Sequence, residues 1–433
     1  MTTGFTTTHF APYAEAAARI VAPFVAADLF AGCILVAEKG VPLLRQGFGL
    51  ADREWNIAHR PSGKFRLGSL TKQFTATAIL QLAERGHLAL DDRVARHFPE
   101  APASWADVTL FHLLTHTSGI PSYTSLPHFF AQEARRDRTP REIIALTENM
   151  PLDFPPGSAF KYNNGAYVIL GHIIELLTGQ SYETYLRENI LDPLGLNDTG
   201  YEHVAAILPE HVRGYRFKTG KIENAGFLAM SVPHAAGAIY STLDDLLAWQ
   251  RALVAAKPFS PASAALMFKD HGHGYGLGWG IQTQFGRRQF VHAGGINGFS
   301  IVVSLYPDDD LFIAVLANIQ AAPVQKIASD LAALYFDVGV EKPALVLDAA
   351  LLADYVGSYR LASGRVLRIT QDGPRLFAET GDHARQELRA VDDQTFVGCL
   401  IDWELRFAAD GVEQAASVVF IRDGAESRGM RED

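Results

Sequence analysis

The sequence lacks the features that define several protein classes. Only two cysteines, Cys33 and Cys399, occur in 433 residues, which argues against a disulfide framework or a cysteine metal site. No uninterrupted apolar run reaches bilayer length, and the amino terminus lacks the charged start and apolar core of a signal peptide. Basic runs are also absent, and the formal net charge of −10 disfavours nucleic acid and anionic membranes as partners. We therefore expect a soluble, cytoplasmic protein that binds neither nucleic acid nor membranes.

Two common catalytic signatures are missing as well. No serine has glycines both two residues before and two residues after it, so the nucleophile elbow of α/β-hydrolases is absent. No His-Glu-x-x-His stretch occurs, and the histidines of "HGHGYG", His271 and His273, lack a supporting acidic or histidine cluster. We interpret "HGHGYG" as a loop bordering a cleft, and we expect neither a metal nor an organic cofactor.

The residues that are present fit a globular protein of more than one folding unit. Hydrophobic residues make up 48% and charged residues 20% of the chain. Strand-like runs around Lys39 and Gly40 predict a hairpin, and helical patterns dominate from about residue 87 to 230. Strand-like runs return near residue 287, with a turn at Asp308 to Asp310 and a helix around 323–336. This order predicts an α/β (α+β) domain in which helices flank an antiparallel sheet and a helical lobe is inserted.

The last part of the chain has a different pattern. Beyond a connector at 341–348, short alternating runs are separated by turn-forming pairs, as expected for a small antiparallel β-barrel. We expect a first domain over 1–340 and the barrel over 349–433. The turn pairs are Asp372-Gly373, Gly381-Asp382, Asp392-Asp393, Asp410-Gly411 and Asp423-Gly424.

The stretch "FRLGSLTKQFTATAILQLAERG", residues 65–86, places a serine and a lysine three residues apart at the start of a predicted helix. Positions three apart lie on one side of a helix, so Lys72 can reach the hydroxyl of Ser69. The apolar spacing predicts that the helix is buried, and burial lowers the pKa of a lysine toward that of a useful base. The alternative is that Ser69 caps the helix and Lys72 is an exposed charge.

A second cluster lies in "FPPGSAFKYNNGAYVILG", residues 154–171, a loop before an apolar helix. Tyr162 could act as a general base if a nearby lysine ammonium lowered its pKa from about 10. Asn164 could hold both the lysine and a substrate amide. The alternatives are a tyrosine that packs on the next helix and an asparagine that caps it.

A third cluster is "VHAGGINGFS", residues 291–300, in which His292 ends a strand and glycines follow. Glycines allow a backbone to approach a ligand closely. The backbone N–H near Gly295 could form an oxyanion hole with that of Ser69. A lone histidine is more often a packed or surface residue, and the glycine-rich setting is what favours a functional role here.

These clusters, in this order, resemble the serine β-lactamase and penicillin-binding protein superfamily, whose first motif is Ser-x-x-Lys. The resemblance covers roughly residues 10–340 and is strongest for the branch that contains class C lactamases, esterases and D-peptidases. It is carried by "FRLGSLTKQFTA", "LALDDRV", "LLTHTSGIPSY", "YNNGAYVILG", "GYGLGWG" and "HAGGINGFS". The tail from "LLADYVGSYRLASGRVLRITQDG" onward resembles the lipocalin-like domain that follows some of these hydrolases, where it could bind a ligand, cover the cleft or mediate homo-oligomer assembly.

The resemblance implies roles for the residues at the motif positions. Ser69 would be the acylated nucleophile, Lys72 and Tyr162 would share its proton, and Asn164 would organise the site. Most lactamases have Lys-Thr/Ser-Gly as the third motif, whereas His292 and Gly294 take those positions here. A lysine there supplies a permanent charge for a substrate carboxylate, whereas a histidine is largely neutral above its reference pKa of about 6.5.

The departure at His292 favours a serine hydrolase of esters, amides or short peptides, of the esterase or D-amino-acid peptidase type. Two rival hypotheses remain. The chain could be a β-lactamase or a penicillin-binding receptor that acylates at Ser69 but turns over slowly, or a non-catalytic scaffold whose motif residues are spectators.

Overall fold

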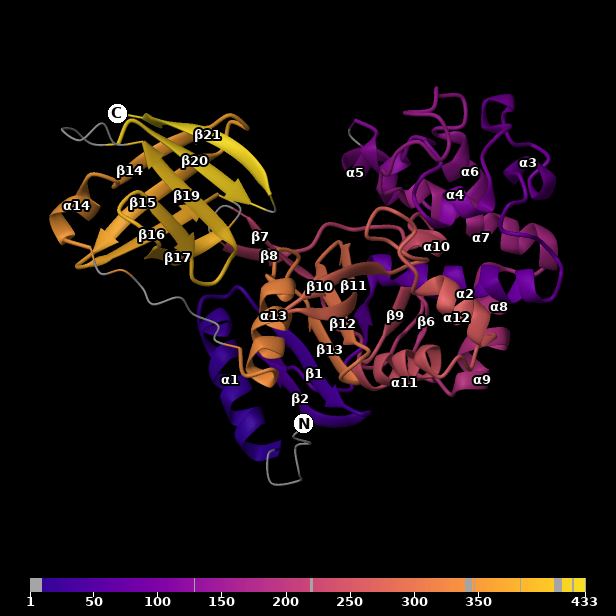
Figure 1. The fold of residues 1–433 in the computed structure, drawn as a ribbon, viewed down its shortest axis with the longest axis horizontal. Coiled ribbons are helices and arrows are strands. Elements are labelled where there is room, and N and C mark those ends of the chain that lie inside the picture. The colour runs from indigo at the N-terminus through magenta and orange to yellow at the C-terminus, as the bar shows by residue number, and fades with distance from the viewer. Residues whose placement is uncertain are drawn as a thin grey trace.

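The molecule consists of a central sheet with helices on both faces, a helical lobe beside the sheet, and a separate β-barrel (Figure 1). None of the described helices is long and apolar enough to cross a bilayer. The computed structural model describes residues 10–127, 129–218, 221–338, 345, 347–381, 383–408, 415–422 and 424–432.

The central sheet is antiparallel and takes strands from both ends of the first 340 residues, as the sequence predicted. Its order is β10-β11-β12-β13-β1-β2, so that Ile34 of β1 pairs with Val315 of β13. The predicted hairpin turn at Lys39 and Gly40 joins β1 to β2, with both residues at positive φ. The strands are β1 (Gly32–Glu38), β2 (Val41–Phe48), β10 (Gly280–Gln284), β11 (Arg287–Ile296), β12 (Phe299–Tyr306) and β13 (Leu311–Ala317).

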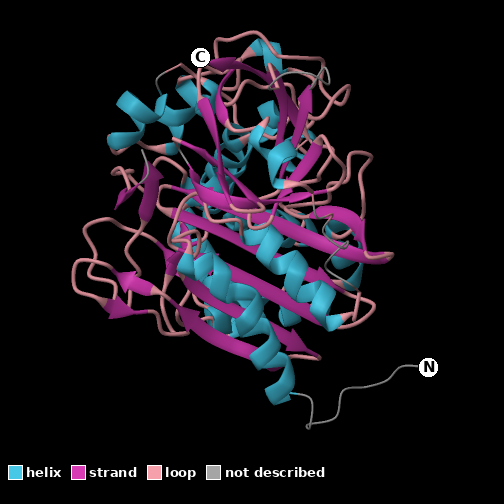
Figure 2. Ribbon diagram, turned by 90° about the vertical axis from the view of Figure 1, so that its left-hand side faces the viewer, coloured by secondary structure: helices cyan, strands magenta, loops and turns pink. Residues whose placement is uncertain are grey.

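Helices bury both faces of this sheet, which explains why β13 is apolar along its whole length. Alternate strand residues point into two different cores: Leu35 packs with residues of α2 and α11, whereas Ile34 packs with those of α1 and α13. Figure 2 shows helices lying across the strands. The helices are α1 (Phe10–Ala26), α2 (Thr71–Glu84), α11 (Leu243–Val254) and α13 (Val324–Tyr335).

The helices from α3 to α9 form the helical lobe, built around α7, which Asn163 caps at its start and Gly179, in the left-handed region, at its end. Tertiary packing also forms short strands that the helical patterns did not indicate. The lobe contains α3 (Val94–His97), α4 (Leu110–Leu114), α5 (Phe129–Gln132), α6 (Pro140–Ala145), α7 (Asn164–Thr178), α8 (Tyr182–Leu186) and α9 (Asp192–Leu194). The short strands β6 (Gly200–Tyr201), β7 (Tyr215–Lys218) and β8 (Lys221–Asn224) follow the lobe along the chain.

Short elements connect the lobe to the sheet. Strand β9 pairs with β5 on one side and β6 on the other, and β3 pairs with β4. These elements bring the Ser-x-x-Lys segment, which follows β5, to the junction of the two parts. They are β3 (Leu50–Asp52), β4 (Ile57–Ala58), β5 (Phe65–Arg66), α10 (His234–Gly237), β9 (Ile239–Ser241) and α12 (Pro261–Met267).

The C-terminal region forms a closed antiparallel barrel of eight strands in sequence order, which β14 and β21 close. Buried aromatic rings fill part of its interior, including Tyr359 and Phe407, whose centroids are 5.7 Å apart. Most of the predicted linker at 341–348, and the turn pair at Asp410-Gly411, lie outside the described residues. The elements are α14 (Ala349–Ala353), β14 (Gly357–Leu361), β15 (Val366–Asp372), β16 (Arg375–Thr380), β17 (His383–Ala390), β18 (Thr395–Gly398), β19 (Trp403–Ala408), β20 (Ser417–Arg422) and β21 (Ala425–Glu432).

Candidate active site

Ser69 lies at the junction of the sheet and the helical lobe, in a 3₁₀ turn (Gly68–Leu70) that runs directly into α2. Its side chain caps neither helical segment, so the capping interpretation of Ser69 is wrong. Gly68 makes the sharp entry possible with a φ of +54°, and a Cβ there would lie 3.0 Å from the carbonyl oxygen of Gly295. The turn that carries Ser69 therefore packs closely against strand β11.

Lys72 has no solvent exposure and contacts three oxygens through its Nζ. The distances are 3.1 Å to Ser69 Oγ, 2.8 Å to Asn164 Oδ1 and 3.0 Å to the carbonyl oxygen of Ala236. Burial lowers the pKa of Lys72 well below its usual value, as the sequence predicted.

The three partners of Lys72 fit a neutral amine. Its two N–H groups can donate to Asn164 Oδ1 and to the Ala236 carbonyl, since both oxygens can only accept. The third partner, the Ser69 hydroxyl, can itself donate to the free lone pair on Nζ. The exposed-charge alternative for Lys72 is thus wrong, and the geometry is that of a nucleophile beside its base.

Asn164 is the first residue of α7 and holds Lys72 in place, whereas the cap of that helix is its neighbour Asn163. The Asn164 side chain also donates from Nδ2 to Thr124 Oγ1 at 3.2 Å. These two contacts fix the amide with its oxygen toward the lysine.

Tyr162 faces the lysine but does not have the lowered pKa that the sequence suggested. Lys72 Nζ lies 4.8 Å from the centroid of the Tyr162 ring. Although the residue is 38% exposed, its hydroxyl end is enclosed, and this burial raises its pKa, outweighing a hydrogen bond with the Ser69 side chain. The expected decrease in the pKa of Tyr162 required a charged lysine. Burial disfavours the charged form of both groups, the lysine ammonium and the tyrosine phenolate. Tyr162 is therefore protonated and can pass a proton on.

His292 is buried in β11, and its hydrogen bonds fix its tautomer. Its Nδ1 lies 2.8 Å from the carbonyl oxygen of Ala293, so Nδ1–H donates there, and Nε2 accepts from the Tyr275 hydroxyl at 3.0 Å. Burial lowers the pKa of His292 to about 3, and a charge on Lys72 would act in the same direction. The predicted neutrality is confirmed, and the partner of Nε2 is the Tyr275 hydroxyl.

The two glycines after His292 differ in their surroundings. A Cβ on Gly294 would lie 2.0 Å from the carbonyl oxygen of Leu67, so only glycine lets β11 reach the turn that carries Ser69. Gly295 is exposed, and a Cβ there would meet nothing within 4 Å. Its backbone thus borders the open cleft next to the serine.

Two residues to which the sequence assigned no role, His116 and Tyr275, pack beside Tyr162 and His292. His116 is buried at a φ of +59° and accepts a hydrogen bond at Nδ1 from the Asn163 N–H at 3.1 Å. Its ring centroid lies 4.3 Å from that of Tyr162 and 4.9 Å from that of Tyr275. Both His116 and Tyr275 occur in stretches that carry the family resemblance, but nothing in those stretches indicates that they meet.

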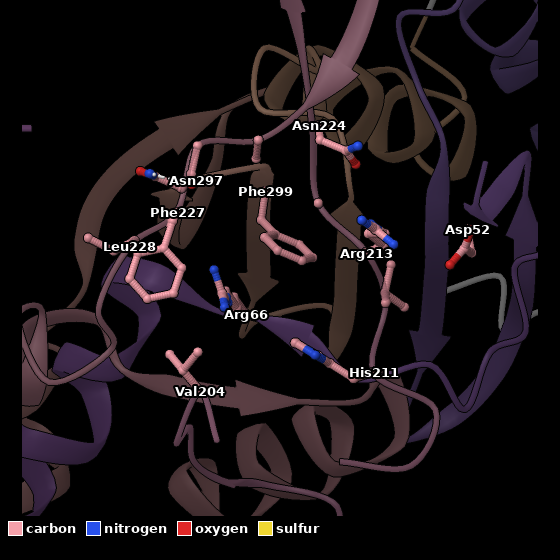
Figure 3. Close-up of a pocket in the computed structure, with 14 residues that line it drawn as sticks. Asp52, Arg66, Val204, His211, Arg213, Asn224, Phe227, Leu228, Asn297 and Phe299 are labelled. Atoms are coloured by element: carbon pink, nitrogen blue, oxygen red, sulfur yellow. Dashed lines mark hydrogen bonds between the residues drawn. The ribbon is translucent and has the colours of Figure 1, made fainter. Parts of the chain in front are cut away.

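The cleft beside Ser69 is mainly apolar. It is lined by aromatic and aliphatic side chains, among them Tyr123, Phe130 and Ile296, together with the polar Asn164. A cavity of about 420 Å³ adjoins it and shares Leu228 and Asn297 with it (Figure 3). The described residues contain no cluster of three or more histidine, cysteine or acidic side chains suited to a metal.

Comparison with known proteins agrees with this geometry. Residues 17–335 match the family model described as Beta-lactamase. Penicillin-binding protein 4* of Bacillus subtilis (strain 168) is 29% identical over 434 residues, which cover 93% of this chain and 95% of that protein. An octameric penicillin-binding protein homologue from Pyrococcus abyssi has a TM-score of 0.71 and 25% identity, covering 96% of this chain and 99% of its own. A D-stereospecific amidohydrolase from Streptomyces has a TM-score of 0.65 and 25% identity, covering 75% and 99%.

The family model spans the sheet and the helical lobe, and two of these relatives extend over the barrel as well. The predicted superfamily and fold class are confirmed, and the eight-stranded barrel is consistent with the predicted lipocalin-like domain. The chain belongs to the beta-lactamase family and is a serine hydrolase of that superfamily.

Proposed function

We propose that this protein cleaves an ester or amide, of the esterase or D-amino-acid peptidase type, through an acyl-enzyme on Ser69. The observation that carries the proposal is the hydrogen bonding of Lys72, which is fully buried between Ser69 Oγ and two oxygens that can only accept. Burial favours the neutral form of this amine, and its Nζ is aimed at the nucleophile, as a general base must be.

In the proposed acylation step, Ser69 Oγ bonds to the substrate carbonyl carbon while its proton moves to Lys72 Nζ. The backbone N–H groups of Ser69 and Gly295 stabilise the negative oxygen of the tetrahedral intermediate. When the bond to the leaving group breaks, that group takes a proton from the hydroxyl of Tyr162, and Tyr162 recovers one from Lys72 Nζ; the raised pKa of Tyr162 keeps it protonated between these transfers. Asn164 keeps Lys72 in place throughout.

In the deacylation step, water attacks the acyl carbon and the same groups work in reverse. A proton from the water returns to Ser69 Oγ as its bond to the acyl group breaks, and a free carboxylic acid leaves. No step needs a group other than the substrate, water and the residues of the chain.

Two observations support an ester or amide that has no carboxylate bound at the third-motif position. The residue at the third-motif position, His292, is neutral and uses both ring nitrogens within the protein, so it cannot supply the ammonium that a β-lactam carboxylate would meet there. The structural relative from Streptomyces is named a D-stereospecific amidohydrolase, and its sequence is 25% identical to this chain. Amides of D-amino acids are therefore the first amides to test.

The test is a rate panel on wild type and Ser69→Ala: p-nitrophenyl esters, D- and L-amino-acid amides, and a chromogenic cephalosporin. We expect turnover of an ester or a D-amide, slower hydrolysis of the cephalosporin, and loss of nearly all activity in Ser69→Ala. Labelling by a fluorophosphonate, located by peptide mass spectrometry, should fall on Ser69. Wild-type turnover in Ser69→Ala would refute the assignment.

A second candidate is a penicillin-binding receptor that acylates but deacylates slowly. It is favoured by the relative from Bacillus subtilis, which is named a penicillin-binding protein and matches almost the whole chain. A burst of one product equivalent per enzyme with the cephalosporin, followed by no steady turnover of any substrate in the panel, would identify it.

A further inference from the structure

The cleft next to Ser69 holds no charge for an anionic substrate group. Its described lining residues include no arginine, lysine or carboxylate. Lys72 is enclosed behind them, and His292 at the third-motif position is neutral. A positively charged partner for a substrate carboxylate would therefore have to lie outside this cleft.

A neighbouring cavity of about 440 Å³ offers such partners. It shares Phe130 and Asn297 with the cleft around Ser69, so the two spaces adjoin across these side chains. Its other described lining residues are two arginines, an amide and two residues of the segment after β8, and none is acidic. They are Arg135, Arg216, Gly226, Phe227 and Gln320.

Hydrogen-bond donors of this cavity remain free. The Arg135 side chain has no hydrogen bond or ion pair within the part of the chain that the structure describes. Arg216 forms an ion pair with Glu223, to which its Nη2 donates at 3.1 Å; its Nε is buried, but the side chain as a whole is 42% exposed. Gln320 uses its Oε1 to accept from the Gly298 N–H at 3.3 Å, which leaves its amide N–H groups for a ligand.

The path between the two spaces is apolar. Phe130 and Phe227 are 58% and 48% exposed, a large fraction for aromatic rings. Both line the cationic cavity, and Phe130 also lines the cleft of Ser69. An apolar chain laid across Phe130 would connect the nucleophile to the arginines.

We propose that the cavity between Arg135 and Arg216 binds a substrate carboxylate, and that preferred substrates carry this carboxylate at the far end of an apolar spacer from the scissile carbonyl. The proposal rests on the proposed acyl transfer at Ser69 and adds a substrate class to it. Guanidinium groups suit this task because they form paired, charge-assisted hydrogen bonds with carboxylates. The tertiary structure assembles the pair from the helical lobe and from β7.

The test compares two esters of one length, mono-p-nitrophenyl suberate with a free carboxylate and p-nitrophenyl methyl suberate without one. In wild type, kcat/KM should be higher for the carboxylate ester. Exposed ion pairs contribute about two- to fivefold each, so Arg135→Gln with Arg216→Gln should lower the carboxylate-to-methyl ratio about tenfold. The wild-type preference should also shrink in high salt.

Arg288→Gln is the matched control. Arg288 is 56% exposed and pairs with Asp308 at 2.7 Å, at the opposite end of β11 from Gly295. It changes the net charge by the same unit as each cavity variant but leaves the cavity intact, so the ratio should stay at the wild-type value. A ratio lowered by Arg288→Gln as much as by Arg135→Gln alone would reduce the effect to long-range attraction of the carboxylate and overturn the proposal.

The two proposals fail in different ways. If the methyl ester is hydrolysed at Ser69 but the double arginine variant keeps the wild-type ratio, the carboxylate subsite is refuted and the hydrolase stands. If neither these esters nor any ester or amide of the rate panel turns over, the hydrolase proposal fails, and calorimetry on Ser69→Ala decides the subsite by itself. Suberic acid monoamide should then bind more tightly than its methyl ester, and the double arginine variant should abolish that difference; equal binding of both ligands would refute the subsite.

Discussion

The protonation state of Lys72 can be tested through protein stability, without any substrate. In the folded protein the amine is fully buried with a lowered pKa, whereas in the unfolded chain it titrates near 10.5. Between these two pKa values the unfolded state binds one proton more than the folded state, so the free energy of unfolding rises with pH. The expected slope from this one group is about 1.4 kcal/mol per pH unit.

The perturbation is Lys72→Met, which keeps an unbranched chain of similar length and removes the titration. The difference in unfolding free energy between wild type and variant isolates Lys72, because all other groups titrate in both proteins. Urea denaturation at pH 7, 8 and 9 can be followed by tryptophan fluorescence. The fluorescence of Trp249 reports on the unfolding of α2, because the centroid of its ring lies 4.2 Å from that of Phe74 on this helix.

We expect wild type to gain about 1.4 kcal/mol per pH unit relative to Lys72→Met, and kcat/KM of the variant to fall about 10²- to 10⁴-fold. Parallel stability curves for the two proteins between pH 7 and 9 would show that Lys72 stays protonated in the fold. In that case it could not take the proton from Ser69, and the proposed mechanism would be wrong.

Three further predictions follow from the same geometry. Tyr162→Phe should lower kcat about 10²- to 10⁴-fold, and adding it to the lysine variant should cost far less than the product of the two losses; multiplicative losses would mean that the groups act separately. Gly294→Ala should destabilise the protein by about 3 kcal/mol in urea denaturation because its Cβ meets the Leu67 carbonyl, whereas Gly295→Ala, with open space, should stay within about 0.5 kcal/mol. His292→Lys should raise the ratio of acylation rates for a cephalosporin over p-nitrophenyl butyrate, and an unchanged ratio would exclude His292 as the determinant of substrate charge.

The sequence alone determined the local part of the site and the class of fold. Ser69 lies in a 3₁₀ turn that runs directly into α2, and Lys72 is three residues further on in the first turn of α2, so their contact follows from local helical geometry. The alternating and helical patterns are likewise local, because they reflect which side of each element is buried. Motifs that share these local constraints were sufficient to indicate the family.

Only the tertiary structure decided the chemical state of these residues. Whether Lys72 is neutral depends on Asn164 and Ala236, which lie 92 and 164 positions further along the chain. Burial lowers the pKa of this amine, and burial also raises the pKa of Tyr162, which the sequence had suggested would fall. The free energy of a charge depends on every group around it, and a linear pattern does not show which groups those are.

The partner of His292 and the arginine pair of the neighbouring cavity are decided in the same way. Tyr275 reaches His292 from a loop that the sequence indicated only as a border of the cleft. Arg135 and Arg216 come from the helical lobe and from a short strand, and neither belongs to a motif. The sequence determines which side chains are available, because local geometry fixes helices and turns; the packing of distant segments determines which of them meet, because burial and charge act through space.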